Sequence, residues 1–253
     1  MVFVKYPDVI AAESDYSILD NPVKVFEKVD GGNCQFRKID GILKGGNRSG
    51  FLDNKKLGNF WFLGFHNWLY SNISLTAVPE HYVFFGEWTA KHAIEYLPEF
   101  TDKFFLVDVL DLETGKIVDY KESATLVNRY SLADINVLRT LKDGKASKGE
   151  IDEMMAGSDY YSGNKEGLVV KDYENQRFMK FLGPDFSEID HTKDGLERYL
   201  TRRRIEKMKF AMLGDGEEDN MKTLVRYLMA DLRKEAGIFP AGRDVEEVLN
   251  KLS

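Results

Sequence analysis

Residues 26–33 read FEKVDGGN, and the meaning of this stretch decides how the whole chain is interpreted. Its apolar residues are typical of a β-strand, and its two glycines allow a sharp turn or a close approach of the backbone to a ligand. Lys28 would therefore lie at the end of a strand, between the carboxylates of Glu27 and Asp30. Such a lysine is unusual as a solvated surface residue but well placed for chemistry, and the other motifs have to decide between the two.

The composition predicts a globular protein of the cytoplasm. Of the 253 residues, 43% are hydrophobic and 13% aromatic, which suffices for the core of one large domain or of a medium and a small one. No run approaches the roughly 20 apolar residues of a membrane span, and the first residues do not resemble a signal peptide. The single cysteine, Cys34, cannot form an internal disulfide, which fits a reducing compartment.

The charge pattern bears on the partner. A net charge of −7 argues mildly against a nucleic-acid binder, although binding depends on local patches rather than on the sum. The densest basic run lies at 198–209 and contains Arg202, Arg203 and Arg204. This run is either the solvated face of a helix or a surface that contacts phosphates. The four histidines are scattered, and no cluster of histidine and cysteine has zinc spacing.

Up to about residue 186 the sequence predicts mostly short strands with turns. Helices are predicted between them at 59–71, 131–142 and 148–156. The predicted strands are rich in β-branched or aromatic residues and bounded by Gly, Asp or Asn. They read VKVFEKV, FRKIDGIL, HYVFFGEW, KFFLVDVLD, GKIVDY, GLVVKDY and RFMKFLG.

After GPDFSEID the pattern becomes helical and stays so from residue 192 to the end. Apolar residues recur at helical spacing between 221 and 232, with Gly237 as a stop signal, and a final short helix is predicted at 243–252. We therefore expect an α+β domain over residues 1–188 and a small all-helical domain over 189–253.

Four segments, taken in order, carry the functional argument. They are EKVDGG at 27–32, FFGEW at 84–88, FFLVDVLD at 104–111, and EGLVVK at 166–171 with the strand RFMKFLG after it. Each is weak alone, because strand ends with an exposed acid and turns before buried strands are common. Their order and spacing together make coincidence a poor explanation.

Together these segments resemble the motifs of the covalent lysyl-nucleotidyltransferase superfamily, which contains DNA ligases, RNA ligases and mRNA-capping enzymes. EKVDGG is similar to its nucleophile motif K-x-D-G, FFGE to the third motif, EGLVVK to the fourth and the strand around Lys180 to the fifth. FFLVDVL is similar to the strand that packs on the purine. The resemblance covers about residues 1–188 and implies a nucleotidyltransferase fold of antiparallel sheets flanked by helices.

Within the superfamily, the chain resembles the phage-type RNA ligase 2 family. The resemblance rests on the opening segment FVKYPDVI, on Asn33 after the glycines, on NRSG at 47–50 and on the run GEWTAKHAIEY at 86–96. DNA ligases and capping enzymes usually continue into an OB domain. The remaining 65 or so residues are helical and too few for one, whereas RNA ligase 2 relatives carry a small helical domain there.

The resemblance implies an ATP-dependent RNA ligase that joins 5′-phosphate and 3′-hydroxyl ends. Lys28 would attack the α-phosphate of ATP to form lysine-AMP, AMP would pass to the RNA 5′ end, and the 3′-hydroxyl would displace it. A free lysine is protonated at neutral pH and cannot attack. A divalent cation, Mg²⁺ or alternatively Mn²⁺, would favour the neutral amine and neutralise the phosphates, and it needs only one or two carboxylates.

Roles for the other site residues follow from the resemblance and from strand alternation. Glu166 would hold the metal, Glu87 the ribose, and Lys180 the α-phosphate. Asp30, two residues after Lys28 and so on the same side of a continuing strand, would orient the lysine or the sugar. The remaining nucleotide-binding candidates are Glu27 at the adenine edge, Arg48 at phosphate, Asn33, and Phe105 on the base.

Two positions depart from the family pattern. The aromatic residue usually found before the aspartate of the purine-packing strand is Val107 here, and Phe105 on the same face is the expected substitute. The fifth motif, usually K-x-K, has only Lys180, and Lys171 or Arg177 on a neighbouring strand is the expected source of a second cation.

Three alternatives remain open at this point. They are a minimal DNA ligase, a capping-type guanylyltransferase, and a ligase-derived nucleic-acid-binding module without catalytic activity. The sequence does not fix whether the RNA is a nicked duplex, a pair of single-stranded ends or a broken tRNA loop, and it does not fix the oligomeric state. It does not identify the source either, although the compact size suggests a phage or a small RNA-repair system. In the RNA ligase context, the basic run at 198–209 is predicted to contact RNA phosphates.

Overall fold

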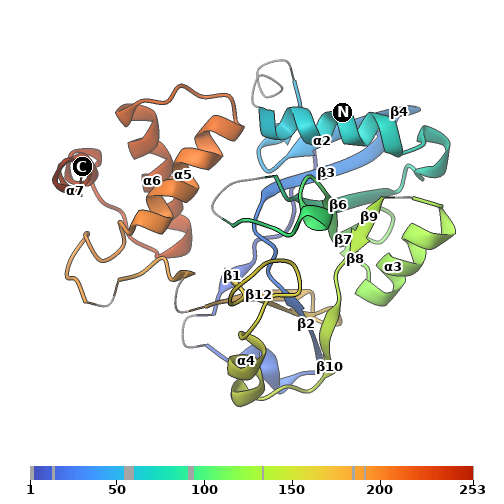
Figure 1. Cartoon of the computed structure of the whole chain (residues 1–253), viewed down its shortest axis with the longest axis horizontal. Helices are drawn as coiled ribbons and strands as arrows, with labels where there is room; N and C mark the ends of the chain where they lie inside the picture. The colour runs from blue at the N-terminus through green and yellow to red at the C-terminus, as the bar shows by residue number, and fades with distance from the viewer. Residues whose placement is uncertain are drawn as a thin grey trace. The chain divides into compact units, whose positions relative to one another are not determined.

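The computed structural model describes residues 3–12, 15–53, 60–90, 94–132, 134–183, 186–190 and 192–252, without the side chains of residues 60 and 61. It divides into two compact units, Met1–Gly183 and Pro184–Ser253. The α+β class holds, with antiparallel sheets and helices in the first unit and helices in the second (Figure 1). Among the described residues, no helix is long and apolar enough to cross a membrane.

The first unit contains two sheets. One has five strands in the order β1 (Ile10–Ala11), β12 (Arg177–Leu182), β11 (Gly167–Asp172), β2 (Val23–Glu27) and β10 (Thr140–Gly144). The other runs through β5 (Gly50–Phe51), β4 (Ile42–Asn47), β3 (Gly32–Ile39), β6 (Tyr82–Trp88), β7 (Phe104–Asp111) and β8 (Lys116–Ile117). Strand β9 (Ile135–Val137) also pairs with β7, in parallel, and the other pairs apart from β1 with β12 are antiparallel.

Helices complete the first unit. Helix α2 (Phe60–Asn72) packs on β3 and β4, and α3 (Tyr120–Arg129) packs on β7 (Figure 1). The short helix α4 (Lys148–Met154) begins with a capping box, in which Ser147 and Glu150 bond each other's backbone amides. The 3₁₀ turns are η1 (Ser17–Asp20), η2 (Leu75–Ala77) and η3 (Pro98–Phe100).

An aromatic core lies between α2 and the larger sheet. The rings of Phe36 and Phe84, on adjacent strands, stack at 4.9 Å, and Trp68 of α2 stacks on Phe104 at 5.0 Å. The five-stranded sheet has its own aliphatic core, which Val25, Leu168 and neighbouring residues bury. Each sheet therefore has an independently packed face, which fixes its register because a shift of one residue would expose that face.

The second unit is built from α5 (Arg202–Gly214), α6 (Met221–Glu235) and α7 (Gly242–Leu252). The three helices share one core, and α5 and α6 begin with the capping side chains of Thr201 and Asn220. Core members include Met212, Leu228, Leu232 and Val245, each fully buried. The segment between residue 192 and Thr201, expected to be helical, forms turns instead.

Two predicted elements of the first unit are wrong. The segment FRKIDGIL is not one strand but the end of β3, a turn and the start of β4. In the turn Asp40 and Gly41 both have positive φ (50° and 73°), the geometry of a type I′ turn. The helix predicted at 131–142 is replaced by β9 and β10, and the helix lies earlier, as α3, capped by Asp119. The β-branched residues of 135–140 pair with β7 and β2, so tertiary pairing decides their structure.

Candidate active site

Lys28 directly follows β2, and its ammonium group lies 2.7 Å from Oε2 of Glu166. Glu166 directly precedes β11, which pairs antiparallel with β2. The Lys28 amide donates to the carbonyl of Gly167 at 2.9 Å, so the pairing continues past both strand ends. The two motifs therefore meet because strand register places the end of one beside the start of the other.

Glycines are required next to both motifs because neighbouring strands approach closely. A Cβ atom on Gly31 would lie 2.3 Å from the carbonyl oxygen of Trp88, and one on Gly167 would lie 2.3 Å from that of Phe181. The backbone of Gly31 thus needs space rather than a positive φ. This close packing draws the loop after Lys28 against the end of β6, which carries Glu87.

Opposing effects set the protonation of Lys28. Burial lowers its pKa, but the negative charges of Glu166, of Asp30 and, once it is ionised, of Glu87 outweigh burial and raise the pKa above the ordinary value for lysine. The side chain as a whole is 24% exposed. In the absence of ligand Lys28 is a protonated cation in an acidic cluster.

Glu87 lies on β6, opposite Asn33 of β3 and Phe105 of β7. Burial raises the pKa of Glu87 to about 8, against the lowering effect of Lys28. Asp30 and Glu166 raise it further, and Arg48 lowers it. The charges of Asp30 and Glu166 thus act on the pKa values of both Lys28 and Glu87. Arg48, exposed in the turn after β4, acts on the pKa of Glu87 as well.

Lys180 shares a face of its sheet with Lys28. It is opposite Val169 of β11, which is opposite Phe26 of β2, two residues before Lys28. Directly opposed residues point to the same side of an antiparallel pair, and so do residues two apart. The register therefore places both lysines on the same side of the sheet.

The expected second cation is not supplied by Lys171. Its side chain is 1% exposed, and its ammonium group bonds Oδ2 of Asp108 and the carbonyl of Val107, each at 2.8 Å. Burial lowers the pKa of Lys171, although Asp108 opposes that effect. The Lys171 alternative is wrong because strand β11 directs this side chain to Asp108 of the other sheet. Arg177, at the start of β12, donates to the Ser17 hydroxyl at 3.1 Å.

Glu27 and Phe105 are both enclosed by protein. Strand alternation places Glu27 on the opposite face of β2 from Lys28, where it accepts hydrogen bonds from the Ser158 hydroxyl and, at 3.2 Å, the Asp159 amide. Phe105 is 1% exposed, with the rings of Tyr160 and Phe100 centred 5.0 and 6.0 Å away. Their contacts with adenine remain predictions.

Two tyrosines hold the motif backbones, and the sequence interpretation did not identify them. The Tyr96 hydroxyl accepts from the amide of Asp30 and donates to its carbonyl, both at 2.8 Å. The Tyr161 hydroxyl accepts from the Glu166 amide at 2.7 Å and donates to Asn164 at 2.9 Å. The two rings meet edge to face at 5.6 Å, so one pair of side chains supports both acidic segments. Tyr96 belongs to the quoted run at 86–96, whereas Tyr161 carried no signal.

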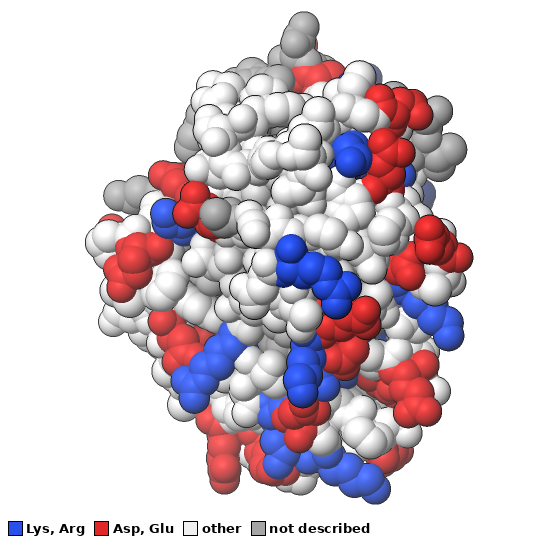
Figure 2. Space-filling model, turned by 90° about the vertical axis from the view of Figure 1, so that its right-hand side faces the viewer, with Lys and Arg blue, Asp and Glu red and all other residues white. Residues whose placement is uncertain are grey.

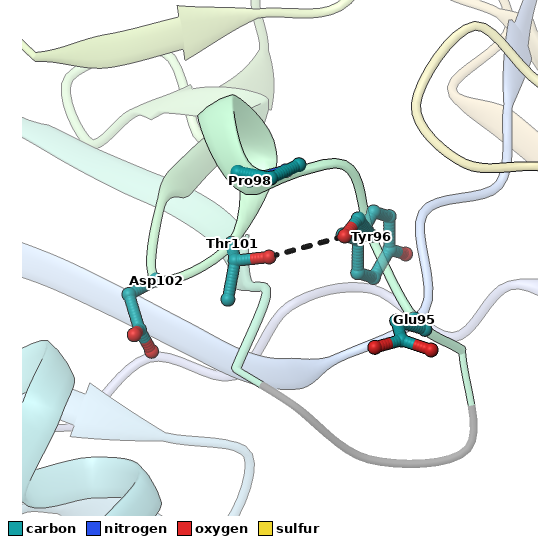
Figure 3. Close-up of a pocket in the computed structure, with 5 residues that line it drawn as sticks. All are labelled: Glu95, Tyr96, Pro98, Thr101 and Asp102. Carbon is teal, nitrogen blue, oxygen red and sulfur yellow. Dashed lines mark hydrogen bonds between the residues drawn. The ribbon is translucent and has the colours of Figure 1, made fainter.

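Tyr96 also lines a pocket in the loop that precedes β7 (Figure 3). The other lining residues are Glu95, Pro98, Thr101 and Asp102, and the Thr101 hydroxyl donates to the Tyr96 carbonyl at 3.3 Å. Two carboxylates in the lining would repel a triphosphate. This pocket is therefore a poor nucleotide site, and the acidic cluster around Lys28 is the better candidate. Residues 91–93 of the quoted run lie outside the described residues.

The donor set around Lys28 fits a hard divalent cation. Mg²⁺ prefers one or two carboxylates, with phosphate oxygens and waters completing its shell, and Glu166 offers such an oxygen beside Lys28. A closed protein cage is not required. None of the described residues forms a group of three or more His, Cys, Asp or Glu side chains that could hold a metal by themselves.

The basic run of the second unit is only partly available for phosphates. Arg204 is 2% exposed and forms ion pairs with Asp231 and Glu188, so the prediction that it contacts RNA is wrong. Its ion pair with Asp231 links α5 to α6. Arg202 is exposed and pairs with Glu206 at 2.8 Å, while the guanidinium of Arg203 lies 5.0 Å from the Phe186 ring.

The chain resembles known proteins in sequence and in fold. The family model described as RNA ligase matches residues 21–182, which is more than half of the chain. No curated protein matches.

Solved structures of the Naegleria gruberi RNA ligase share the fold. A lysine-to-alanine variant with ATP and Mn has 17% identity and a TM-score of 0.59, covering 74% of this chain and 58% of that one. An apo aspartate-to-alanine variant has 17% identity and a TM-score of 0.59, and the match covers 74% of this chain and 57% of that one. A lysine-to-methionine variant with AMP and Mn has 16% identity and a TM-score of 0.59, and the match covers 74% of this chain and 58% of that one. The present chain thus spans less than two thirds of these proteins, and at this identity the likeness concerns the fold.

The family match covers each of the motifs from Lys28 to Lys180, and the structure assembles their acidic residues around one lysine. The chain belongs to the RNA ligase family.

Proposed function

We propose that this protein is an ATP-dependent RNA ligase that joins a 5′-phosphate to a 3′-hydroxyl end through a covalent lysine-AMP intermediate on Lys28. The observation that carries the proposal is the ammonium group of Lys28, held 2.7 Å from Glu166 at the end of the nucleophile motif. Membership of the RNA ligase family supports the reaction class. ATP and a divalent cation are proposed as in the Naegleria gruberi structures, which contain ATP or AMP with Mn.

The first step requires a neutral amine. Lys28 loses its proton to water, its nitrogen attacks the α-phosphorus of ATP, and the bond to pyrophosphate breaks to leave lysine-AMP. The ligand-free site opposes this step, because its acids raise the pKa of Lys28. A divalent cation on Glu166 would reverse that effect by replacing a net negative neighbour with a positive one and would stabilise the departing pyrophosphate.

The later steps return the lysine to its initial state. A 5′-phosphate oxygen of RNA attacks the AMP phosphorus, the phosphorus–nitrogen bond breaks, and Lys28 is released. The RNA 3′-hydroxyl then attacks the activated 5′-phosphate, and AMP leaves. Lys180, on the same side of the sheet as Lys28, is proposed to stabilise charge on the α-phosphate. Glu87 and Asp30 are proposed to position the ribose and the lysine.

The test weighs the intact protein after incubation with Mg²⁺ and either ATP or GTP. We expect the added mass of one AMP with ATP, and its loss in Lys28→Ala. The matched control is Lys24→Ala, which removes a lysine from β2, the strand that Lys28 follows, and should keep the adduct. The ammonium group of Lys24 is ion-paired to Asp143 at 3.0 Å. Added pyrophosphate should remove the AMP from protein that purifies already adenylylated.

Joining is then assayed with 5′-phosphorylated RNA, 5′-hydroxyl RNA and DNA of the same sequence. We expect product only from 5′-phosphorylated ends, and with RNA in preference to DNA. An adduct in Lys28→Ala would refute the nucleophile, and a GMP adduct would favour a capping enzyme. A folded protein that forms no adduct and yields none to pyrophosphate would instead be a binding module.

A further inference from the structure

A shallow groove runs along one stripe of α6 in the second unit. Its lining residues are Lys222, Val225, Arg226, Met229, Ala230 and Arg233. They recur every three or four positions and so lie on one side of the helix. Of these residues, Val225 and Met229 also pack on the core that Leu224, Leu228 and Leu232 bury. The volume of about 310 Å³ is at the lower end for small-molecule pockets. Three cations therefore flank a narrow apolar floor about 16 Å long.

The cations of the groove are accessible. Lys222, Arg226 and Arg233 are exposed, and neither Lys222 nor Arg233 has a carboxylate within ion-pair distance among the described residues. Arg226 pairs with Glu217 at 3.1 Å, with 62% and 32% of the side chains exposed. An exposed pair of this kind is weak, so a phosphate can replace the carboxylate at little cost.

An exposed aromatic ring lies beside the last of these cations. Phe239 is 76% exposed, the highest value among the exposed large hydrophobic residues described. The guanidinium of Arg233 lies 5.8 Å from its ring centre. Gly237, with a φ of 65°, ends the helix and turns the chain toward this position. An apolar ring held in solvent next to an arginine is a platform on which a base can stack.

The distribution of charge elsewhere distinguishes this groove. On the face of the molecule in Figure 2, lysine and arginine side chains stand among acidic ones rather than in a continuous track. On α5, the buried side chain of Arg204 forms ion pairs within the unit, with Glu188 and Asp231. The match to the RNA ligase family ends at residue 182 and so assigns nothing to α6.

We propose that the α6 groove, together with Phe239, binds a single-stranded segment of the RNA substrate. Lys222, Arg226 and Arg233 contact consecutive phosphates, and an unpaired base stacks on Phe239. The combination of cations, apolar floor and exposed ring is the chemistry of single-strand binding, in which stacking tolerates any base. An acidic protein segment would use the cations but would leave the exposed ring unexplained. The inference rests on the proposed function, since it takes RNA as the substrate.

The test measures binding of a fluorescent oligouridine to the full chain over a range of salt concentrations. Changing Lys222, Arg226 and Arg233 to alanine should lower the salt slope, d log K/d log[salt], by about 2 in magnitude, given about 0.7 per phosphate contact on single strands. Phe239→Ala should weaken binding roughly tenfold at every salt concentration, because stacking is not screened. A duplex RNA of equal length should be much less sensitive to Phe239→Ala.

The matched control changes the exposed lysines Lys145, Lys193 and Lys251 to alanine, which removes the same net charge from other positions. It should leave the slope nearly unchanged, and an equal change in both triple variants would overturn the proposal. Formation of lysine-AMP, weighed in each variant, should be normal. Loss of RNA binding with a normal adduct thus concerns the groove, whereas loss of the adduct concerns the proposed function.

A second measurement does not depend on variants. RNA containing 4-thiouridine is crosslinked to the wild-type protein, and the labelled peptides are identified. Crosslinks within 221–242 support the groove, and crosslinks confined to other segments overturn it. Competition by polyglutamate but not by oligouridine would also overturn it, in favour of an acidic protein partner.

Discussion

At the level of single residues, the Glu87 carboxyl shows how the site favours a protonated acid. Burial raises its pKa to about 8, and the carboxylates of Asp30 and Glu166 add to the effect. At neutral pH and without ligands, the Glu87 carboxyl is therefore mainly protonated and can donate as well as accept a hydrogen bond. This suits a group proposed to meet a ribose hydroxyl, and it makes the stability of the ligand-free protein depend on pH.

Glu87→Gln should flatten that dependence. An unfolded glutamate has a pKa near 4.3, so between about pH 4.5 and 8 the folded state binds a proton that the unfolded state lacks. The resulting stabilisation is complete below the unfolded pKa and is lost as the pH rises through 8, at up to about 1.4 kcal/mol per pH unit. The free energy of unfolding, measured with urea and EDTA from pH 5 to 8, should fall in the wild type and much less in the variant.

Glu150→Gln is the matched control for this experiment. Lys142 lowers the pKa of Glu150 to about 2, so its titration affects stability below the range tested. Its curve should run parallel to that of the wild type between pH 5 and 8. Parallel curves for wild type and Glu87→Gln would contradict the raised pKa.

The sequence identified the acids of the site but not the residues that hold them. Lys28 and Glu166 lie in motifs, and the structure brings them together across 138 positions. Tyr96 and Tyr161 act through hydroxyl groups on backbone amides, and which amide a hydroxyl reaches depends on tertiary structure. The basic run misled for the same reason, because only the folded helix pair shows that Arg204 faces Asp231.

At the level of elements, the two sheets are tied together by a buried polar cluster. Lys171 of β11 bonds Asp108 of β7, which also accepts from the hydroxyls of Tyr6 and Tyr173. The ammonium group lies 5.0 Å from the centre of the Phe26 ring. Strand β11 begins directly after Glu166, and strand β7 pairs with β6, which carries Glu87. The cluster therefore joins the strands on which these two acids of the site depend.

Lys171→Met should therefore cost about 3 to 5 kcal/mol of the free energy of unfolding, because it leaves Asp108 as a buried charge without a cation. The double variant Lys171→Met with Asp108→Asn should cost less than the single one, since the introduced amide is neutral and its single oxygen still accepts from one of the two tyrosines. Urea unfolding measures both. Additive costs would show that the pair does not act as a unit, and Lys24→Met, at a partly exposed pair, should cost under about 1 kcal/mol.

Elements with local signals could be predicted, and those fixed by pairing could not. Helices α2, α4 and α6 were predicted close to where they lie, because capping residues and apolar spacing indicate helices in the sequence. Helix α3 was missed, although Asp119 is a capping residue, because the preceding β-branched residues suggested a longer strand. Residues 135–137 pair with the distant strand β7, which no local pattern indicates.

At the level of the whole molecule, the residues proposed for lysine adenylylation and those proposed for the α6 groove fall in different units. Lys28, Glu87, Glu166 and Lys180 lie within Met1–Gly183, and the groove lies within Pro184–Ser253. Each unit also buries its own hydrophobic core. The family match ends one residue before the boundary, at 182. The residues proposed to react with ATP thus lie in one unit, and some of the residues proposed to bind RNA lie in the other.

Residues 1–183 expressed alone should therefore fold and form lysine-AMP, yet join RNA poorly. The site and both sheets are retained, so circular dichroism should show a cooperative unfolding transition and mass spectrometry the AMP adduct. Joining at subsaturating RNA should fall on the order of tenfold or more, because the phosphate contacts of the second unit are lost. Saturating RNA should recover part of the rate, which distinguishes weak binding from defective chemistry. A folded 1–183 without adduct would instead mean that the helical unit takes part in the attack on ATP, and undiminished joining would remove the second unit from RNA binding.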